Sequence, residues 1–415
     1  MFPWKDILQF ILTNTLTVYF EPMFWLIIAL IGYQYWQMQK NQRRMFGVYG
    51  CSLSRQLVLA VFFGTVGGII GSFLLTAVGI TLNKLGLNYI WPVALLLMVI
   101  NMRFLCFAYA GGLVALSKVL FGWPEVNVPQ VLALVAVLHI TESVLIAISG
   151  RYSAMPMILR HSSGRLVGAF SLQNFWPLPL VLLALKIASG GELSGDTVNM
   201  PDWWPLLRLD TGALDESQLQ YVMFPVVAAL GYTDIAITSS PEARRRQSAI
   251  HLAAYSILLL LLALLSNTYT WLQAVAALVS PLGHELLIQL DNRREMRGKP
   301  RYVPPEHGAM ILETVPGSLA RRLGLKPGDI LTALAGMPVN NGNDLAMALS
   351  YVPAEFTVDI RREGREVRLN ASFLGGVRQM GVILVPEGQE LHYVEVRTER
   401  FGILGWIKEK IKGSK

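Results

Sequence analysis

The sequence predicts a polytopic α-helical membrane bundle followed by a small α/β domain. Of the 415 residues, 53% are hydrophobic and only 15% are charged, and the mean hydropathy is +0.45, as is typical of integral membrane proteins. Long apolar runs recur before residue 290, and short strands with glycine and proline turns follow them. We therefore expect a transmembrane domain of about eight or nine helices over residues 1–291, a basic linker over 292–305, the small domain over 306–388 and a basic amphipathic tail over 389–415.

The composition also excludes several classes of protein. The net charge of +7 fits basic residues in cytoplasmic loops. These residues are not interleaved with aromatic residues along a groove, so we expect no binding of nucleic acid. The two cysteines, Cys51 and Cys106, show neither a disulfide framework nor metal-ligand spacing. We expect no metal site and no cofactor.

Apolar runs of about 20 residues mark the expected spans. Residues 1–19 are expected to form an interfacial helix or a poor span, and the first clear span is 23–36. The run 87–121 is long for one span and short for two. Because burying Arg103 in mid-membrane would cost at least ~2.5 kcal/mol, we expect a helical hairpin that turns at 101–103. Further spans are expected at 56–80, 128–149, 166–187, 221–237, 250–266 and 270–290, which makes about nine in all.

Glycines are concentrated in the expected span 56–80. Gly64, Gly67, Gly68 and Gly71 form two overlapping GxxxG spacings, which let neighbouring elements approach closely. We expect tight packing within the chain, and the alternative is contact with a second copy of the protein.

Charges in the loops give the expected orientation. Basic residues gather on the cytoplasmic side of membrane proteins. The acidic segment 190–220 fits the outside, although acidic residues contribute little to orientation. The small domain is expected in the cytoplasm, because a basic cluster precedes it: Arg293, Arg294, Arg297, Lys299 and Arg301.

Ionisable residues inside the expected spans are candidate functional groups, because charge in a membrane indicates function by default. His139 and Glu142 lie three residues apart on one helix face, and the alternative is a polar pair that is satisfied within the bundle. The full set of intramembrane candidates is His139, Glu142, Asp234, His284 and Glu285.

His284 and Glu285 begin a pattern similar to HExxH, in which two histidines one helical turn apart bind zinc. The fifth position is Ile288, so one ligand is missing. His139 would have to replace it, with Asp291 or Glu142 as a third ligand. We therefore expect no active metalloprotease and no catalytic residues.

The segment 310–339 has the clearest local folding signals. Strand 311–315 is followed by a turn, by the helix 319–323 with Ser318 as its cap, and by strand 330–335. A helix over 341–351 and a hairpin of strands 356–362 and 365–372 follow. This pattern resembles a PDZ domain in the arrangement common in bacteria. The resemblance implies that the domain binds an extended peptide by strand addition.

A PDZ domain holds the peptide carboxylate in a hydrophobic-Gly-hydrophobic loop. The segment 301–308, before the first strand, has no such sequence, whereas the segment after the hairpin does. We expect a circularly permuted order with the groove strand at 382–385. The alternatives are an ordinary final strand, or a degenerate loop that binds an internal segment or a folded partner. The expected groove residues are Met380, Gly381, Val382, Ile383, Leu345 and Leu349.

Several short motifs, taken in order, resemble the MinJ family of polytopic membrane PDZ proteins of bacterial cell division. They are the Pro22 span with its basic loop, His139-Ile140-Thr141-Glu142, Gly231-Tyr232-Thr233-Asp234, Pro241-Glu242 and Gly283-His284-Glu285 ahead of the PDZ domain. The resemblance implies a scaffold without enzymatic activity, in the bacterial cell membrane and enriched at the septum and poles. It further implies division proteins as partners, through a bridge between a pole- or septum-marking protein and the Min inhibitor. Oligomeric state is left open.

Two other classes of function stay open from the sequence. One is an intramembrane metalloprotease of the site-2 type, or its inactive relative. The other is a membrane carrier or sensor with a regulatory PDZ domain, which would use His139, Glu142 and Asp234 as a polar site. An inverted internal repeat would favour a carrier, and the sequence shows none.

Overall fold

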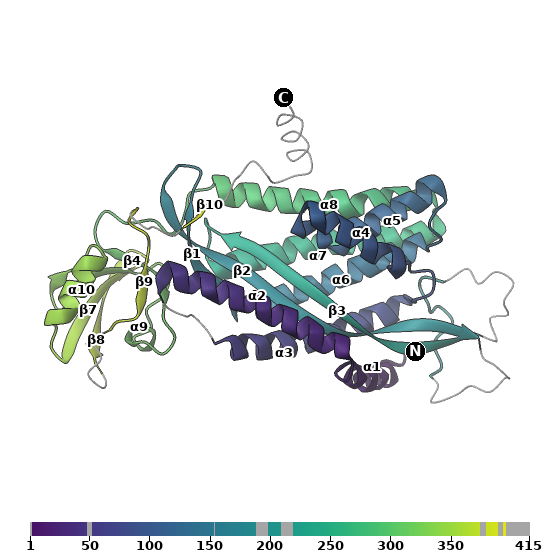
Figure 1. Cartoon of the computed structure of the whole chain (residues 1–415), viewed down its shortest axis with the longest axis horizontal. Coiled ribbons are helices and arrows are strands. Elements are labelled where there is room, and N and C mark those ends of the chain that lie inside the picture. Colours follow the sequence, from purple (N-terminus) through teal and green to yellow (C-terminus); the bar gives the residue numbers. More distant parts are fainter. Residues whose placement is uncertain are drawn as a thin grey trace, which may run out of the picture.

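A body of helices around a long β-hairpin makes up most of the molecule, and the small α/β domain lies at one end of it (Figure 1). The computed structural model describes residues 2–47, 52–152, 154–187, 198–208, 219–373, 379–388 and 393–395. The helices of the body are α1 (Trp4–Val18), α2 (Pro22–Phe46), α3 (Leu53–Val78), α4 (Leu87–Ile100), α5 (Phe107–Phe121), α6 (Val128–Ser149), α7 (Pro241–Thr268) and α8 (Trp271–Arg297). Most of the expected amphipathic tail and of the acidic segment lies outside the described residues.

Four helices of the described chain are long and apolar enough to cross a membrane: α3, α6, α7 and α8. Helices α1 and α2 add a fifth span if they are counted as one, although they bend by 72° at their junction. These helices indicate a membrane protein. By length and composition, the described residues thus hold four or five candidate spans, compared with the nine that the sequence predicts.

Two of the predicted spans are strands instead of helices. Strand β3 (Leu219–Ala236) pairs antiparallel along its whole length with residues 170–187 of β2 (Leu166–Ile187), and β1 (Ala154–Arg160) pairs with the start of β2. Pro177 and Pro179 explain part of the error, because a proline in a helix interior removes a hydrogen bond and clashes with the preceding turn. Both prolines lie beyond the end of β1, where β2 has a free edge that tolerates them.

The glycines of α3 pack against this hairpin. A Cβ atom on Gly64 would clash with the carbonyl oxygen of Pro177, and one on Gly68 would lie 2.5 Å from that of Pro179. Ser72, one turn further, accepts a 2.8 Å hydrogen bond from the backbone N–H of Val181. The expected close packing is therefore present, with a strand backbone as the partner.

The predicted helical hairpin at 87–121 is confirmed. Helix α4 ends at Ile100, a short 3-10 helix η1 (Met102–Leu105) makes the turn, and Asn101 caps it through a 3.2 Å bond from the backbone N–H of Arg103. At 1.5 Å per residue, α4 and α5 are each roughly 21–23 Å long, which is short of the ~30 Å hydrocarbon core. Neither helix alone is therefore long enough to cross that core.

The small domain contains the strands and helices that the sequence predicts. Its sheet has the order β8-β7-β5-β4-β9, with β6 paired to β5, and α10 packs on the same core. Glu363 and Gly364, both with positive φ, form the tight turn of the β7–β8 hairpin. The elements are β4 (Ala309–Thr314), α9 (Leu319–Arg322), β5 (Ile330–Leu334), β6 (Met337–Pro338), α10 (Gly342–Tyr351), β7 (Glu355–Arg362), β8 (Arg365–Ser372) and β9 (Val382–Leu384).

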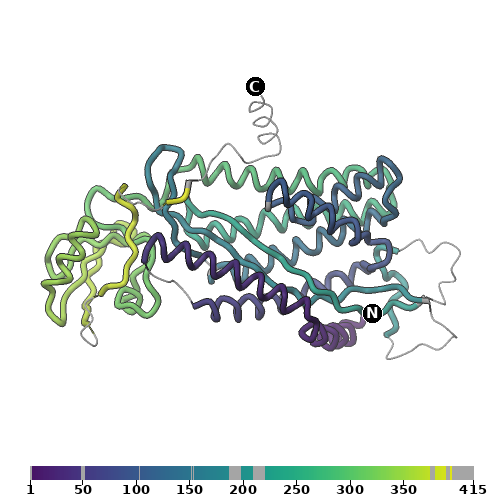
Figure 2. The backbone as a smooth tube through the Cα atoms, in the orientation of Figure 1, coloured from purple at the N-terminus to yellow at the C-terminus, as the bar shows by residue number. Residues whose placement is uncertain are grey.

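The chain returns from the small domain to the sheet of the body (Figure 2). Strand β10 (Val394–Glu395) pairs parallel with β1. On the way into the domain, the N–H of Gly168 in β2 donates a 2.9 Å bond to the carbonyl of Tyr302, which is only 1% exposed. Leu312 of β4 belongs to the same buried cluster as Tyr302. The two parts thus share a packed interface.

We expect Gly68→Ala to lower the stability of the body by about 1–3 kcal/mol, because the new methyl group meets backbone that cannot move cheaply. Gly32→Ala in α2 is the matched control, since its nearest neighbour would be a leucine methyl at 3.6 Å. Thermal unfolding of both variants in detergent measures the difference. Equal melting temperatures for the two variants would contradict the close packing of α3 on β2.

Candidate functional site

Strand β9 forms an open edge of the small domain. A 2.8 Å bond from the N–H of Val315 to the carbonyl of Gly381 flanks the pair Thr314–Val382. In an antiparallel ladder such a pair makes no hydrogen bonds with its partner, so the N–H and C=O of Val382 point away from β4. Leu384, two residues further, is placed in the same way. The described residues place no strand on that side of β9, so its backbone groups are available to a peptide.

The loop before β9 has the geometry of an anion site. The carbonyl of Met380 accepts a 2.9 Å bond from the N–H of Ala320, and that of Gly381 accepts from Val315. Because a trans peptide points its N–H opposite to its C=O, the N–H groups of Gly381 and Val382 face away from α9 and β4. The positive φ of Gly381, 71°, permits this turn. Successive N–H groups of this kind can bind a carboxylate.

Helix α10 begins beside this edge, where a Cβ atom on Gly342 would lie 3.9 Å from Leu384. The N–H of Gly342, at its start, donates a 3.0 Å bond to the Glu387 side chain after β9. Leu345 is buried, and the half-buried Leu349 packs on the same core. Five of the six residues that the sequence assigns to the groove, Met380, Gly381, Val382, Leu345 and Leu349, belong to this edge and the core beneath it.

The side chain of the sixth residue, Ile383, faces elsewhere. It packs with Val385 and Tyr302 in the buried cluster of the body. The alternation of side chains along a strand explains this, because Val382 and Leu384 face the core of the small domain. The groove strand therefore lies between its own domain and the body.

Burial at this interface shifts the pKa of two titratable groups. Burial raises the pKa of the Tyr302 hydroxyl to about 12. Burial also raises the pKa of the Glu313 carboxyl, although a hydrogen bond from the Thr314 N–H acts in the opposite direction.

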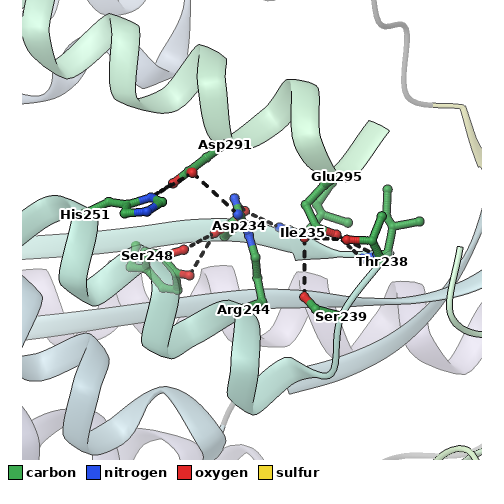
Figure 3. A network of polar contacts seen from close by, with 11 residues as sticks. Asp234, Ile235, Thr238, Ser239, Arg244, Ser248, His251, Asp291 and Glu295 are labelled. Carbon is green, nitrogen blue, oxygen red and sulfur yellow. Dashed lines mark hydrogen bonds and ion pairs between the residues drawn. The ribbon is translucent and has the colours of Figure 1, made fainter. Parts of the chain in front are cut away.

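A polar network joins β3 to the two helices that lead to the small domain (Figure 3). Asp234, near the end of β3, accepts bonds from Arg244 at 2.8 Å, Ser248 at 2.6 Å and Tyr232 at 3.0 Å. The Arg244 side chain is 1% exposed and also lies 3.8 Å from Asp291 of α8. Asp234, a candidate functional residue from the sequence, is thus part of a buried ionic cluster.

The same network continues along α8. Asp291 accepts a 2.9 Å bond from His251, and Glu295 accepts from the backbone N–H groups of Ile237 and Thr238 at 2.7 and 2.8 Å. Asp291 is therefore engaged here, away from His139, and does not complete the zinc site considered from the sequence. The network fixes the end of β3 between α7 and α8.

Glu285 is the centre of a second polar cluster. It accepts a 2.7 Å bond from Arg103 of the α4–α5 turn and a 2.8 Å bond from the hydroxyl of Tyr109. Gln289 donates a third bond, at 2.7 Å. The carboxylate is an ion-pair partner of Arg103, which accounts for both charges within the apolar bundle.

The structure brings His139 and His284 together, with a ring-centroid distance of 5.1 Å. Cys106 lies beside both, and the sequence analysis missed it because its neighbours in space are far away in the sequence. Glu142 is half-buried one turn further along α6, and His139 makes its hydrogen bonds to Cys106 and to the carbonyl of Val135.

Fold and site together define a class: a membrane protein with several apolar helices and a PDZ domain. The family model described as "PDZ domain" matches residues 310–362. The chain is 25% identical to "Cell division topological determinant MinJ" of Bacillus subtilis (strain 168) over 392 residues, which cover 90% of this chain and 94% of that protein. The chain is therefore similar to MinJ along nearly its whole length, and it carries a PDZ domain.

Shorter similarities have the size of a PDZ domain. The chain is 33% identical over 84 residues to "Probable cell division topological determinant MinJ" of Lacticaseibacillus paracasei, covering 20% of this chain and 23% of that protein. It is 30% identical over 74 residues to "Periplasmic serine endoprotease DegP" of Escherichia coli (strain K12), covering 17% of this chain and 16% of that protein. The long similarity is thus to a division determinant, and that to a protease is confined to a short segment.

Replacing Arg244 tests the polar network. Arg244→Met leaves two buried carboxylates without their cation, so we expect a loss of about 3–5 kcal/mol in stability. The control is Arg246→Met, two residues along α7, where the side chain is exposed. Denaturant unfolding in detergent measures both variants. A loss no larger than that of the control would mean that the network contributes little to the fold.

Proposed function

We propose that this protein is a membrane-anchored scaffold whose PDZ domain binds the free carboxyl terminus of a partner protein at β9. The observation that carries the proposal is the open backbone edge at Val382 and Leu384, directly after the N–H groups of Gly381 and Val382. A partner peptide adds as a strand along this edge, beside α10. Its carboxylate lies at the start of β9, and apolar side chains contact Leu349.

The cellular role that we propose is division-site selection. The similarity to MinJ along nearly the whole chain supports it. In this role the scaffold bridges a protein that marks the pole or septum and the Min inhibitor. The basic residues that follow α8 support a cytoplasmic PDZ domain, because cytoplasmic flanks of spans are enriched in arginine and lysine.

Peptide binding tests the groove. The probe is a panel of fluorescent hexapeptides with apolar C-terminal residues, each as the free acid and as the amide, and the full-length protein is held in nanodiscs. We expect at least one free acid to bind and its amide to lose about tenfold or more in affinity, because one charge-assisted hydrogen bond contributes roughly 1.5–3 kcal/mol. Equal affinities for acid and amide would exclude the carboxylate site.

A pair of substitutions on α10 locates the groove. Leu349→Lys should abolish the binding of the same peptide, whereas Met347→Lys, whose side chain is 61% exposed, should leave it unchanged. Circular dichroism of both variants checks the fold. If both variants bind the peptide as tightly as the unmodified chain, the groove lies elsewhere.

The division role is tested by imaging a fluorescent fusion in the native host. We expect the unmodified chain at septa and poles, and Leu349→Lys evenly distributed in the membrane at equal abundance. A septal signal that persists in the variant would assign recruitment to the membrane body. A uniform signal from the unmodified chain in dividing cells would contradict the division role.

A further inference from the structure

Three side chains that can bind a metal ion meet inside the helical bundle. Cys106 precedes α5, His139 lies near the middle of α6, and His284 lies near the middle of α8. The Sγ atom of Cys106 is 3.1 Å from His139 Nε2 and 3.8 Å from His284 Nε2. All three donor atoms lie within 4.8 Å of one another. The fold thus makes a cluster from three separate segments.

The spacing of the donors fits a single ion. Zinc binds thiolate sulfur at about 2.3 Å and imidazole nitrogen at about 2.0 Å, so a tetrahedral site separates sulfur and nitrogen by roughly 3.5 Å. The two observed distances, 3.1 and 3.8 Å, lie on either side of this value. Small side-chain shifts would bring both histidines to the same ion.

His139 is held in the tautomer that a metal ligand needs. Its Nδ1 atom lies 2.7 Å from the carbonyl oxygen of Val135. A carbonyl only accepts, so Nδ1 carries the hydrogen and Nε2 presents its lone pair to Cys106. A backbone carbonyl that orients a histidine from behind is a regular feature of metal sites.

Hydrogen bonding alone does not satisfy this cluster. The single thiol hydrogen of Cys106 can be donated to only one of the two imidazoles. His284 is 9% exposed, and its Nε2 atom lies 3.8 Å from the same sulfur. Buried polar groups are nearly always paired. An ion that takes the lone pairs of Cys106, His139 and His284 would account for their arrangement.

We propose that Cys106, His139 and His284 bind one zinc ion in the centre of the bundle. This differs from the sequence-based expectation of no metal site, because the cysteine becomes a ligand only through the fold. The hydroxyls of the flanking Tyr109 and Tyr255 are engaged by Glu285 and by the carbonyl of Ser280. Cys106, His139 and His284 therefore supply the protein ligands of the proposed site.

The ion has a structural role. It ties the turn of the short α4–α5 hairpin to α6 and α8, which are long enough to span the membrane. Glu285, next to His284, is bound by Arg103 and Tyr109 and is not free to act as a general base. The arrangement therefore differs from a hydrolytic zinc site.

Metal analysis of the full-length protein tests the proposal. The protein is expressed with added zinc, purified in detergent and passed over a gel-filtration column. We expect one zinc ion per chain in the unmodified protein and in His307→Gln, whose side chain is exposed. Cys106→Ser, His139→Gln and His284→Gln should each lose the zinc. A folded unmodified protein without zinc, or zinc that persists in all three variants, would overturn the proposal.

A second measurement does not require the ligand variants to fold. Cobalt replaces zinc in the unmodified protein and in Cys51→Ser, and thiolate-to-cobalt charge transfer is read by absorption. We expect the band in both proteins, because Cys106 is the proposed ligand and the sequence has only two cysteines. Iodoacetamide should modify Cys106 in the Cys51→Ser protein more slowly when zinc is bound. Cobalt without a charge-transfer band, or alkylation that zinc does not slow, would exclude the thiolate ligand.

Discussion

The close approach of α3 to the backbone of β2 is the contact on which the rest of the body depends. A long apolar hairpin among helices must cover both faces and satisfy its backbone groups. Gly64 and Gly68 bring a helix directly onto the carbonyls of Pro177 and Pro179, and Ser72 supplies a hydrogen-bond acceptor for the free edge at Val181. Larger residues would separate the helix from the strand and leave that edge uncovered.

The hairpin in turn positions the PDZ domain. Strand β1, which pairs with β2, also pairs with β10 after the domain, and the N–H of Gly168 in β2 donates a bond to the carbonyl of Tyr302 before it. Ile383, in the strand that we assign to the peptide groove, packs against the body. A peptide that adds to β9 therefore binds beside a surface fixed to the membrane bundle. The orientation of such a peptide would follow from this packing.

The sequence predicts local features of this fold well and long-range ones poorly. The PDZ elements follow from turn chemistry, such as the Ser318 cap and the positive φ at Gly324 and Gly328. An apolar run of about 20 residues, however, is compatible with a spanning helix and also with a strand that is buried on both faces. Pro177 and Pro179 in β2 are the signal against a helix there, and the expected span 166–187 rests on apolar length alone.

The candidate sites divide in the same way. The proposed groove loop corresponds to a short motif in the sequence, whereas the contact between Cys106 and the two histidines depends on segments distant in the sequence. No spacing rule applies to such a set, since each segment contributes one ligand.

The buried ionisable residues of the body fall into two groups with different physical meaning. Asp234, Asp291 and Glu285 each face a cation, so their charges are compensated. Removing one partner of such a pair would leave a buried charge, which explains their presence without a catalytic role. Cys106, His139 and His284 instead contact one another, and among the described residues none of the three forms an ion pair. Their donor atoms lie close to one another. A metal cation bound between them would give these three residues a positively charged partner, as the buried carboxylates already have.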